Sequence, residues 1–195
     1  MKFLKLVKNH MVRLCNIAFC ILLLAVWLIG FIKVNSEYPQ RVDTYIGTGE
    51  SFSVNNITCV LEEARLFSGR DFIVSYGTNN EDDDLEQVTL EKDYILISKL
   101  CFSNATKETQ MFTPLYIMAQ SGAWRNGVQL DFFYSLNKTE NGTYRLVPNE
   151  ALTLYVPFVV SEEQFLDDSE DLAEKQYELL FSIYPKTQRV EVELS

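Results

Sequence analysis

The segment YILISKLCF, residues 94–102, is the longest run of strand-forming residues in the chain, and the fold assignment depends on it. In an extended strand Ile95 and Ile97 point to one face, whereas Leu96 and Leu100 point to the other. A strand with apolar residues on both faces is usually covered on both of them. We therefore expect this segment to be a central strand of a sheet.

Further strand patterns lie on both sides of this segment, separated by turn signals. Pro114 interrupts one of them, which indicates an edge or a bulge, and Asn141-Gly142 predicts a hairpin. Between residues 161 and 175 we expect one short helix with Ser161 as its N-cap. The sequence thus predicts an all-β, immunoglobulin-like antiparallel β-sandwich. The expected strands are residues 51–54, 57–67, 71–76, 88–103, 111–120, 128–136, 144–147, 152–160, 177–184 and 190–194.

The N-terminal region contains an apolar run, residues 14–32, in which Asn16 is the main polar residue. A helix of this length spans the hydrocarbon core of a bilayer, about 30 Å. Lys2, Lys5, Lys8 and Arg13 precede the run, and positive charge favours the cytoplasmic side.

We therefore expect a single-pass protein of the cell membrane with four segments: a cytoplasmic tail (1–13), a transmembrane signal-anchor in contact with lipid (14–33), a tether (34–44) and an extracytoplasmic sandwich (45–195). A cleaved secretory signal is the alternative, although the apolar run is long for one.

The charge of the chain is divided unevenly. Of 17 Lys and Arg residues five lie within residues 1–33, which leaves 12 cations against 27 acidic residues and a net charge of −15 for the remainder. Such a surface repels the phosphate backbone, so we expect no nucleic-acid partner. It is compatible with cationic peptides, and it also simply favours solubility.

The four cysteines fall into two pairs. Cys15 and Cys20 lie in the apolar run, where together with Asn16 they are candidates for a helix-packing face. Cys59 and Cys101 lie in the exported part, where disulfides persist. Strand alternation places Cys101 on the face of Ile97 and so argues against a bond to Cys59, but spacing alone leaves this disulfide open.

No constellation of catalytic residues is evident. The one histidine, His10, precedes the apolar run, so an exported Ser-His-Asp or Cys-His site is excluded. We expect no cofactor and no metal. The acidic run at residues 79–84 lacks the spacing of a calcium loop and is better interpreted as a solvated loop. A paired-carboxylate glycosidase site is not excluded by residue counts.

Four Asn-X-Thr motifs begin at Asn56, Asn104, Asn137 and Asn141. They fit glycosylation of a eukaryotic type II membrane protein. They equally fit the turn chemistry of Asn and Thr, which is the interpretation that we prefer.

Four stretches resemble the telokin-like, immunoglobulin-like extracytoplasmic domains of unknown function in Gram-positive bacteria. They are Tyr45–Glu50 followed by Ile57–Leu66, Tyr94–Asn104, residues 149–158 and Tyr177–Leu194. This resemblance implies a sandwich outside the cytoplasm. It supplies no catalytic residues, because no such residues define the family.

Three functional hypotheses follow. The first is a non-catalytic module that binds an envelope protein or peptide, with Trp124 and Arg125 as candidate contact residues, since Trp and Arg are enriched at interface hot spots. Trp124 as a core residue is an equally good interpretation. The second is an accessory subunit of a membrane complex, and the third is a carbohydrate-processing enzyme.

Overall fold

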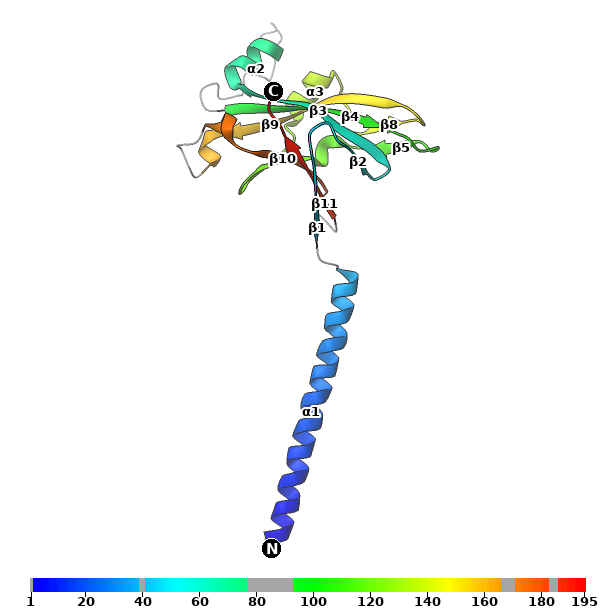
Figure 1. Cartoon of the computed structure of the whole chain (residues 1–195), viewed down its shortest axis with the longest axis vertical. Coiled ribbons are helices and arrows are strands. Elements are labelled where there is room, and N and C mark those ends of the chain that lie inside the picture. Colours follow the sequence, from blue (N-terminus) through cyan, green and yellow to red (C-terminus); the bar gives the residue numbers. More distant parts are fainter. Residues whose placement is uncertain (1, 39–40, 77–92, 166–170, 183–185) are drawn as a thin grey trace. The chain divides into compact units, whose positions relative to one another are not determined.

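The computed structural model describes residues 2–38, 41–76, 93–165, 171–182 and 186–195, with side chains from residue 13 onward except Cys15 (Figure 1). The chain divides into two compact units, residues 1–41 and 42–195, each described by itself. The first contains helix α1, Lys2–Glu37. Its segment Asn16–Glu37 has a mean hydropathy of 2.7 and is long and apolar enough to cross a membrane.

The second unit is a β-sandwich, which confirms the predicted fold class. The larger sheet has the order β1 (Val42–Ile46), β11 (Lys186–Val192), β10 (Tyr177–Ser182), β6 (Met118–Ser121) and β7 (Trp124–Gly127). The other has the order β2 (Ser51–Val54), β3 (Ile57–Ser68), β4 (Asp93–Ser103) and β9 (Ala151–Ser161). A short ribbon pairs β5 (Gln110–Phe112) with β8 (Tyr144–Leu146).

The strand pairs are antiparallel apart from β1 and β11, which run parallel. Strand β1 begins at Val42 and helix α1 ends at Glu37. The stretch 34–44, which we interpreted as a tether, therefore includes the end of a helix and the start of a strand.

Strand β4 supplies residues to two apolar clusters, as its two-sided pattern predicts. Leu96 and Leu100 are fully buried in the main core between the sheets. Ile95 and Ile97 point the other way, into a second cluster beneath α2 (Gly69–Tyr76) and α3 (Leu130–Asn137). The second cluster consists of Phe72, Ile95, Ile97 and Phe132.

Strand β3 contains a bulge that reverses its two faces. Leu61 pairs with Leu100, and Glu63 pairs with the next residue of β4, Lys99, so Glu62 is the extra residue. Odd-numbered residues before the bulge face the main core, whereas those after it face outward, because side chains alternate with a period of two. Ala64, just after the bulge, is fully buried in the main core.

Two predicted strands are helices in the structure. Residues 71–76 belong to α2, and most of residues 128–136 belong to α3. In α2, Phe72 and Tyr76 are one helical turn apart, so both lie against the outer face of the sheet. The hairpin predicted around Asn141-Gly142 is also wrong. The residues before it form helix α3, and strand β8 after it pairs with β5.

The helix predicted for residues 161–175 is also wrong within the described residues. These contain two short 3₁₀ turns, η3 (Glu162–Gln164) and η4 (Leu172–Glu174). Ser161 lies at the N-cap of η3, but its side chain makes no capping hydrogen bond.

Strand β9 lies at a sheet edge, yet residues at both ends of α3 bond backbone groups on its outer side. The backbone N–H of Gln129 donates to the carbonyl of Pro157 at 2.9 Å. Asn137 acts as a neighbouring strand would: its Nδ2 donates to the Tyr155 carbonyl at 2.8 Å, and its Oδ1 accepts the Tyr155 N–H at 2.9 Å. A bare edge is a template for aggregation, and here it is covered.

In two of the Asn-X-Thr motifs the side-chain amide of the asparagine makes hydrogen bonds that stabilise the fold. Asn104 is fully buried, and its Nδ2 donates to the carbonyls of Glu108 and Leu146 at 2.8 and 3.0 Å. Asn137 holds the β9 edge. In the folded domain these two amides serve the fold, whereas Asn56 and Asn141 are exposed.

Asn137→Ala is expected to lower the free energy of unfolding by about 2 kcal/mol, because it leaves a backbone N–H and a carbonyl of β9 without their partners. The matched control is Asn141→Ala, which changes an exposed asparagine of the following loop and should alter stability by less than about 0.5 kcal/mol. The unfolding free energies of both variants are measured by urea titration of the full chain in detergent. Trp fluorescence is the readout, in a Trp27→Phe background. Equal midpoints for the two variants would contradict the role assigned to Asn137.

Candidate functional site

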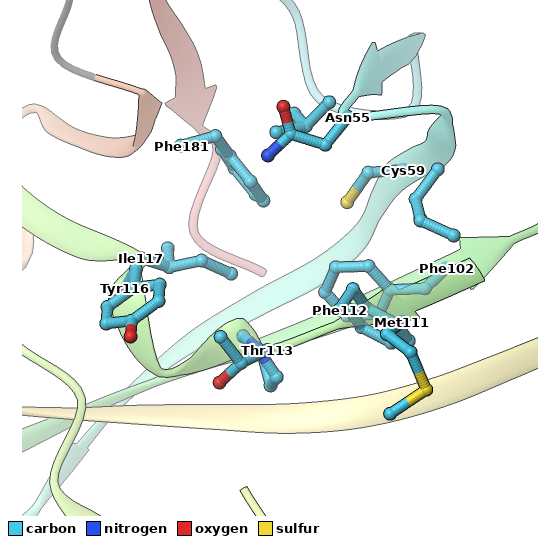
Figure 2. A pocket seen from close by; sticks show the side chains of 12 residues that line it. Asn55, Cys59, Phe102, Met111, Phe112, Thr113, Tyr116, Ile117 and Phe181 are labelled. Atoms are coloured by element: carbon cyan, nitrogen blue, oxygen red, sulfur yellow. The ribbon is translucent and has the colours of Figure 1, made fainter. Parts of the chain in front are cut away.

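An apolar pocket of about 220 Å³ opens from the surface of the second unit into the main core (Figure 2). It lies between the β2–β3 hairpin of one sheet and Phe181 at the end of β10 in the other. Core residues form much of its wall, which makes it an open extension of the core. The apolar lining residues include Val54, Ile57, Cys59, Phe102, Phe112, Ile117 and Phe181.

Two turns shape the entrance of the pocket. Asn55 and Asn56 both have positive φ, 47° and 68°, which gives the tight two-residue hairpin between β2 and β3. On the opposite side Pro114 begins the 3₁₀ turn η2 (Pro114–Tyr116), so the predicted interruption at this proline is confirmed. Thr113 caps the turn by accepting the Leu115 N–H and also donates to the Gly142 carbonyl at 2.6 Å.

Two large apolar side chains stand exposed at the rim. Met111 is 61% exposed and Tyr116 is 79% exposed, and both contribute to the pocket lining. Exposed Met and Tyr side chains beside a concave apolar surface are typical of protein-binding sites, where both residue types are enriched.

Cys59 directs its sulfur into the pocket (Figure 2). Its side chain is only 1% exposed. Burial raises the pKa of its thiol well above the ordinary value, and nearby Cys101 raises it further, while a hydrogen bond to the Val60 backbone opposes the shift. At neutral pH the thiol is therefore protonated and acts as an apolar wall, since the thiolate is the reactive form.

The disulfide that spacing left open does not form in the structure, in which Cys59 and Cys101 are both free. The register pairs Cys59 with Phe102 and Cys101 with Val60 on the neighbouring strand. Directly paired residues share a face, so the two sulfurs lie on opposite faces of the sheet. A disulfide requires Cβ atoms about 3.8 Å apart on one side.

The candidate contact residues Trp124 and Arg125 begin strand β7. The interpretation of Trp124 as an exposed contact is wrong: it is 7% exposed, stacks on Phe165, and its Nε1 donates to Gln164 Oε1 at 2.8 Å. Arg125 is exposed, and its guanidinium bonds Gln120 on the neighbouring strand. The core interpretation of Trp124 is therefore the right one.

The remaining predicted sites lie elsewhere in the chain. Within the described residues no group of three or more His, Cys, Asp or Glu side chains is placed to hold a metal ion. The acidic run 79–84 lies outside the described residues. On α1, Asn16 and Cys20 are one helical turn apart and so share a face, while the side chain of Cys15 is outside the description.

Sequence reasoning missed the pocket because its lining comes from four separate regions of the chain. The available signals were the proline within residues 111–120 and the Asn55-Asn56 turn, and both mark its entrance. Neither signal showed that the two turns face each other.

The fold and the apolar helix define the class: a β-sandwich domain that follows a candidate membrane span. Residues 45–188 match the family described as Domain of unknown function (DUF5028). This match covers most of the chain, and the chain therefore belongs to that family.

Solved structures with similar folds share little sequence with the chain. An uncharacterized β-sandwich protein from Clostridium difficile 630 is 10% identical, with a TM-score of 0.45 over 79% of this chain and 97% of that one. A functionally unknown protein from Listeria monocytogenes EGD-e is 13% identical, with a TM-score of 0.47 over 69% of this chain and 70% of that one. The yjhA protein from Bacillus subtilis is 9% identical, with a TM-score of 0.43 over 76% and 99% of the two chains. No curated protein matches the chain in sequence.

The two thiols of the second unit are expected to differ in reactivity. In the full chain with Cys15→Ser and Cys20→Ser, N-ethylmaleimide at pH 7 should modify Cys59 at least about tenfold more slowly than the half-buried Cys101, because Cys59 is buried and rarely ionised. Mass spectrometry of the digested protein measures both rates, and unfolding in urea should equalise them. Recovery of a peptide in which Cys59 is bonded to Cys101 would contradict the assignment of opposite faces.

Proposed function

We propose that this protein is a non-catalytic binding module of the bacterial envelope, and that its apolar pocket receives one apolar side chain of a polypeptide partner. The observation that carries the proposal is the pocket of about 220 Å³ flanked by the exposed Met111 and Tyr116. A buried anchor in a pocket, surrounded by a rim of weaker contacts, is the usual pattern of an interface hot spot.

The size of the pocket favours a side chain over a small-molecule ligand. Sites for drug-sized ligands measure roughly 300–1,000 Å³ and enclose most of the ligand. At about 220 Å³ this pocket is smaller than that range, and it is open at one side. It suits a single aromatic or aliphatic side chain of a partner protein, while the rest of the partner stays outside the pocket.

Charge favours a cationic partner. The part of the chain after residue 33 has 12 basic and 27 acidic residues. Such an imbalance attracts positively charged partners over the Debye length and accelerates their association. We therefore propose a partner in which the apolar side chain is flanked by Lys or Arg.

We further propose that α1 is an uncleaved anchor with its N-terminus in the cytoplasm, so that the sandwich lies outside the cell membrane. The cations at residues 2, 5, 8 and 13 support this orientation. The resemblance to immunoglobulin-like domains of Gram-positive bacteria supports the same location.

The orientation predicts that an alkaline phosphatase fused after Ser195 is active in bacterial cells, because this reporter matures only outside the cytoplasm. Replacing the cations at residues 2, 5, 8 and 13 with Ser should lower the activity by weakening the charge bias. An inactive phosphatase fusion together with an active cytosolic reporter at the same position would contradict the orientation.

The pocket is tested with the full chain in nanodiscs, with ¹³C-labelled Met and Ile methyl groups. Indole, as a mimic of a Trp side chain, should shift the methyl signals of Met111, Ile57 and Ile117. The methyls of Ile95 and Ile97 should not move, because they belong to the second cluster. A peptide with Trp between lysines should bind more tightly than indole and lose affinity with added salt.

The double variant Met111→Ser/Tyr116→Ser should weaken peptide binding about tenfold or more, because it removes the two apolar side chains of the rim. Leu130→Ser/Val74→Ser, which changes two other exposed apolar residues, is the matched control and should bind as the unmodified protein does. Unchanged affinity of the rim variant, or indole shifts centred on Ile95 and Ile97, would contradict the proposed site.

A second candidate function is that of an accessory subunit whose anchor packs against another helix. The polar Asn16 within the apolar run 14–32 supports it, because such side chains form hydrogen bonds between helices in membranes. Asn16→Leu separates the two roles: it should leave peptide binding at the pocket unchanged and affect only association within the membrane.

A further inference from the structure

A second pocket, of about 200 Å³, lies on the outer face of the β3–β4–β9 sheet beside the end of α2. The bulge in β3 creates it. Without the extra residue, Glu63, Arg65 and Phe67 would continue the inward face of Leu61, but the register shift turns all three outward. Bulges that re-aim side chains are over-represented next to functional sites.

The sheet register brings the polar residues of this pocket together. Glu63 of β3 pairs with Lys99 of β4, and Lys99 pairs in turn with Tyr155 of β9. Tyr76, near the end of α2, closes the pocket from above the sheet, and its ring meets that of Phe67 edge-on with centroids 5.6 Å apart. The site thus combines three aromatic rings with charged groups from neighbouring strands.

The charges of the pocket are already paired. Arg65 bonds Glu63, and Lys99 Nζ lies 3.0 Å from Glu62 Oε2. The hydrogen bond to Glu62 raises the pKa of Lys99 and so keeps it charged. Burial, followed by Tyr155, raises the pKa of Tyr76, which keeps this phenol protonated as a donor. Among the described residues the hydroxyls of Tyr76 and Tyr155 have no hydrogen-bond partner.

We propose that this second pocket binds one ring of an uncharged saccharide. The paired ions and the two phenols, which have no hydrogen-bond partner among the described residues, offer donors and acceptors side by side, which suits hydroxyl groups, because each hydroxyl both donates and accepts. The ring of Phe67 and the floor formed by Ile97 offer an apolar surface for the C–H face of a sugar.

Charged ligands fit less well. A carboxylate or phosphate would have to displace Glu62 or Glu63 from the cations, and an ammonium group would meet Arg65 and Lys99 directly. Breaking an existing ion pair to make a new one gains little near the surface. A neutral ring can form hydrogen bonds with the charged residues of the lining, Glu63, Arg65 and Lys99, without separating the ion pairs. This site lies on the opposite face of the sheet from the apolar pocket, and the inference stands apart from the proposed function.

The test uses the full chain in nanodiscs and saturation-transfer-difference NMR with glucose and N-acetylglucosamine as neutral probes. Glucuronate and glucosamine serve as charged comparators. A neutral probe should give a signal at millimolar concentration and bind more tightly than its charged analogues. The combined variant Tyr76→Phe/Tyr155→Phe keeps both rings but removes both hydroxyls, and each lost hydrogen bond should weaken binding about fivefold.

Tyr45→Phe, which removes an exposed hydroxyl from the other sheet, is the matched control and should bind as the unmodified chain does. The inference is overturned if no neutral probe binds, if a charged analogue binds more tightly, or if the double variant binds as well as the control. Because the indole-sensitive methyls of the apolar pocket lie elsewhere, they report on the proposed function separately.

Discussion

The burial of β4 on both faces is the constraint on which the rest of the domain depends. Residues 95–98 are each at most 4% exposed, so the strand requires a covering layer on either side. Full burial of an aliphatic side chain stabilises the fold by about 1.5–3 kcal/mol. Exposing either face of β4 would therefore remove several such contributions to stability. The larger sheet covers one face. Helices α2 and α3 cover the other face through Phe72 and Phe132.

The bulge at Glu62 gives β3 a different use in each of its halves. Before it, Ile57 and Cys59 face inward and line the apolar pocket. After it, Glu63 and Arg65 face outward beside the paired charges of the second pocket. One extra residue thus lets a single strand contribute an apolar wall to one site and polar groups to another. A simple alternating strand could not do this, because its odd-numbered residues would all share one face.

The strand predictions succeeded for most of the sandwich, including the short β2, and failed where helices α2 and α3 cover the outer face of the sheet. The two-sided pattern of residues 94–102 correctly predicted a central strand, and strand alternation correctly separated Cys59 from Cys101. Residues 130–136 are rich in aromatic side chains, which favour strands locally, but tertiary packing of Phe132 onto the sheet makes them a helix. Trp124 was misplaced because the turn at Gly122, with φ of 57°, joins β6 and β7 into a tight hairpin over residues 118–127 that the sequence pattern did not reveal. The second pocket depends on the bulge, whose only trace in the sequence is the change of phase from Ile57, Cys59 and Leu61 to Ala64 and Leu66.

Native-state hydrogen exchange of the full chain in nanodiscs tests the central role of β4 most directly. If β4 holds both layers, its amides from Ile95 to Leu100 should exchange only through global unfolding and be the slowest of the sandwich. The amides of the edge strand β1 should exchange much faster, through local opening. If the amides of β4 exchanged as fast as those of β1, or faster than those of β10 and β11, the account of a fold built around this strand would be contradicted.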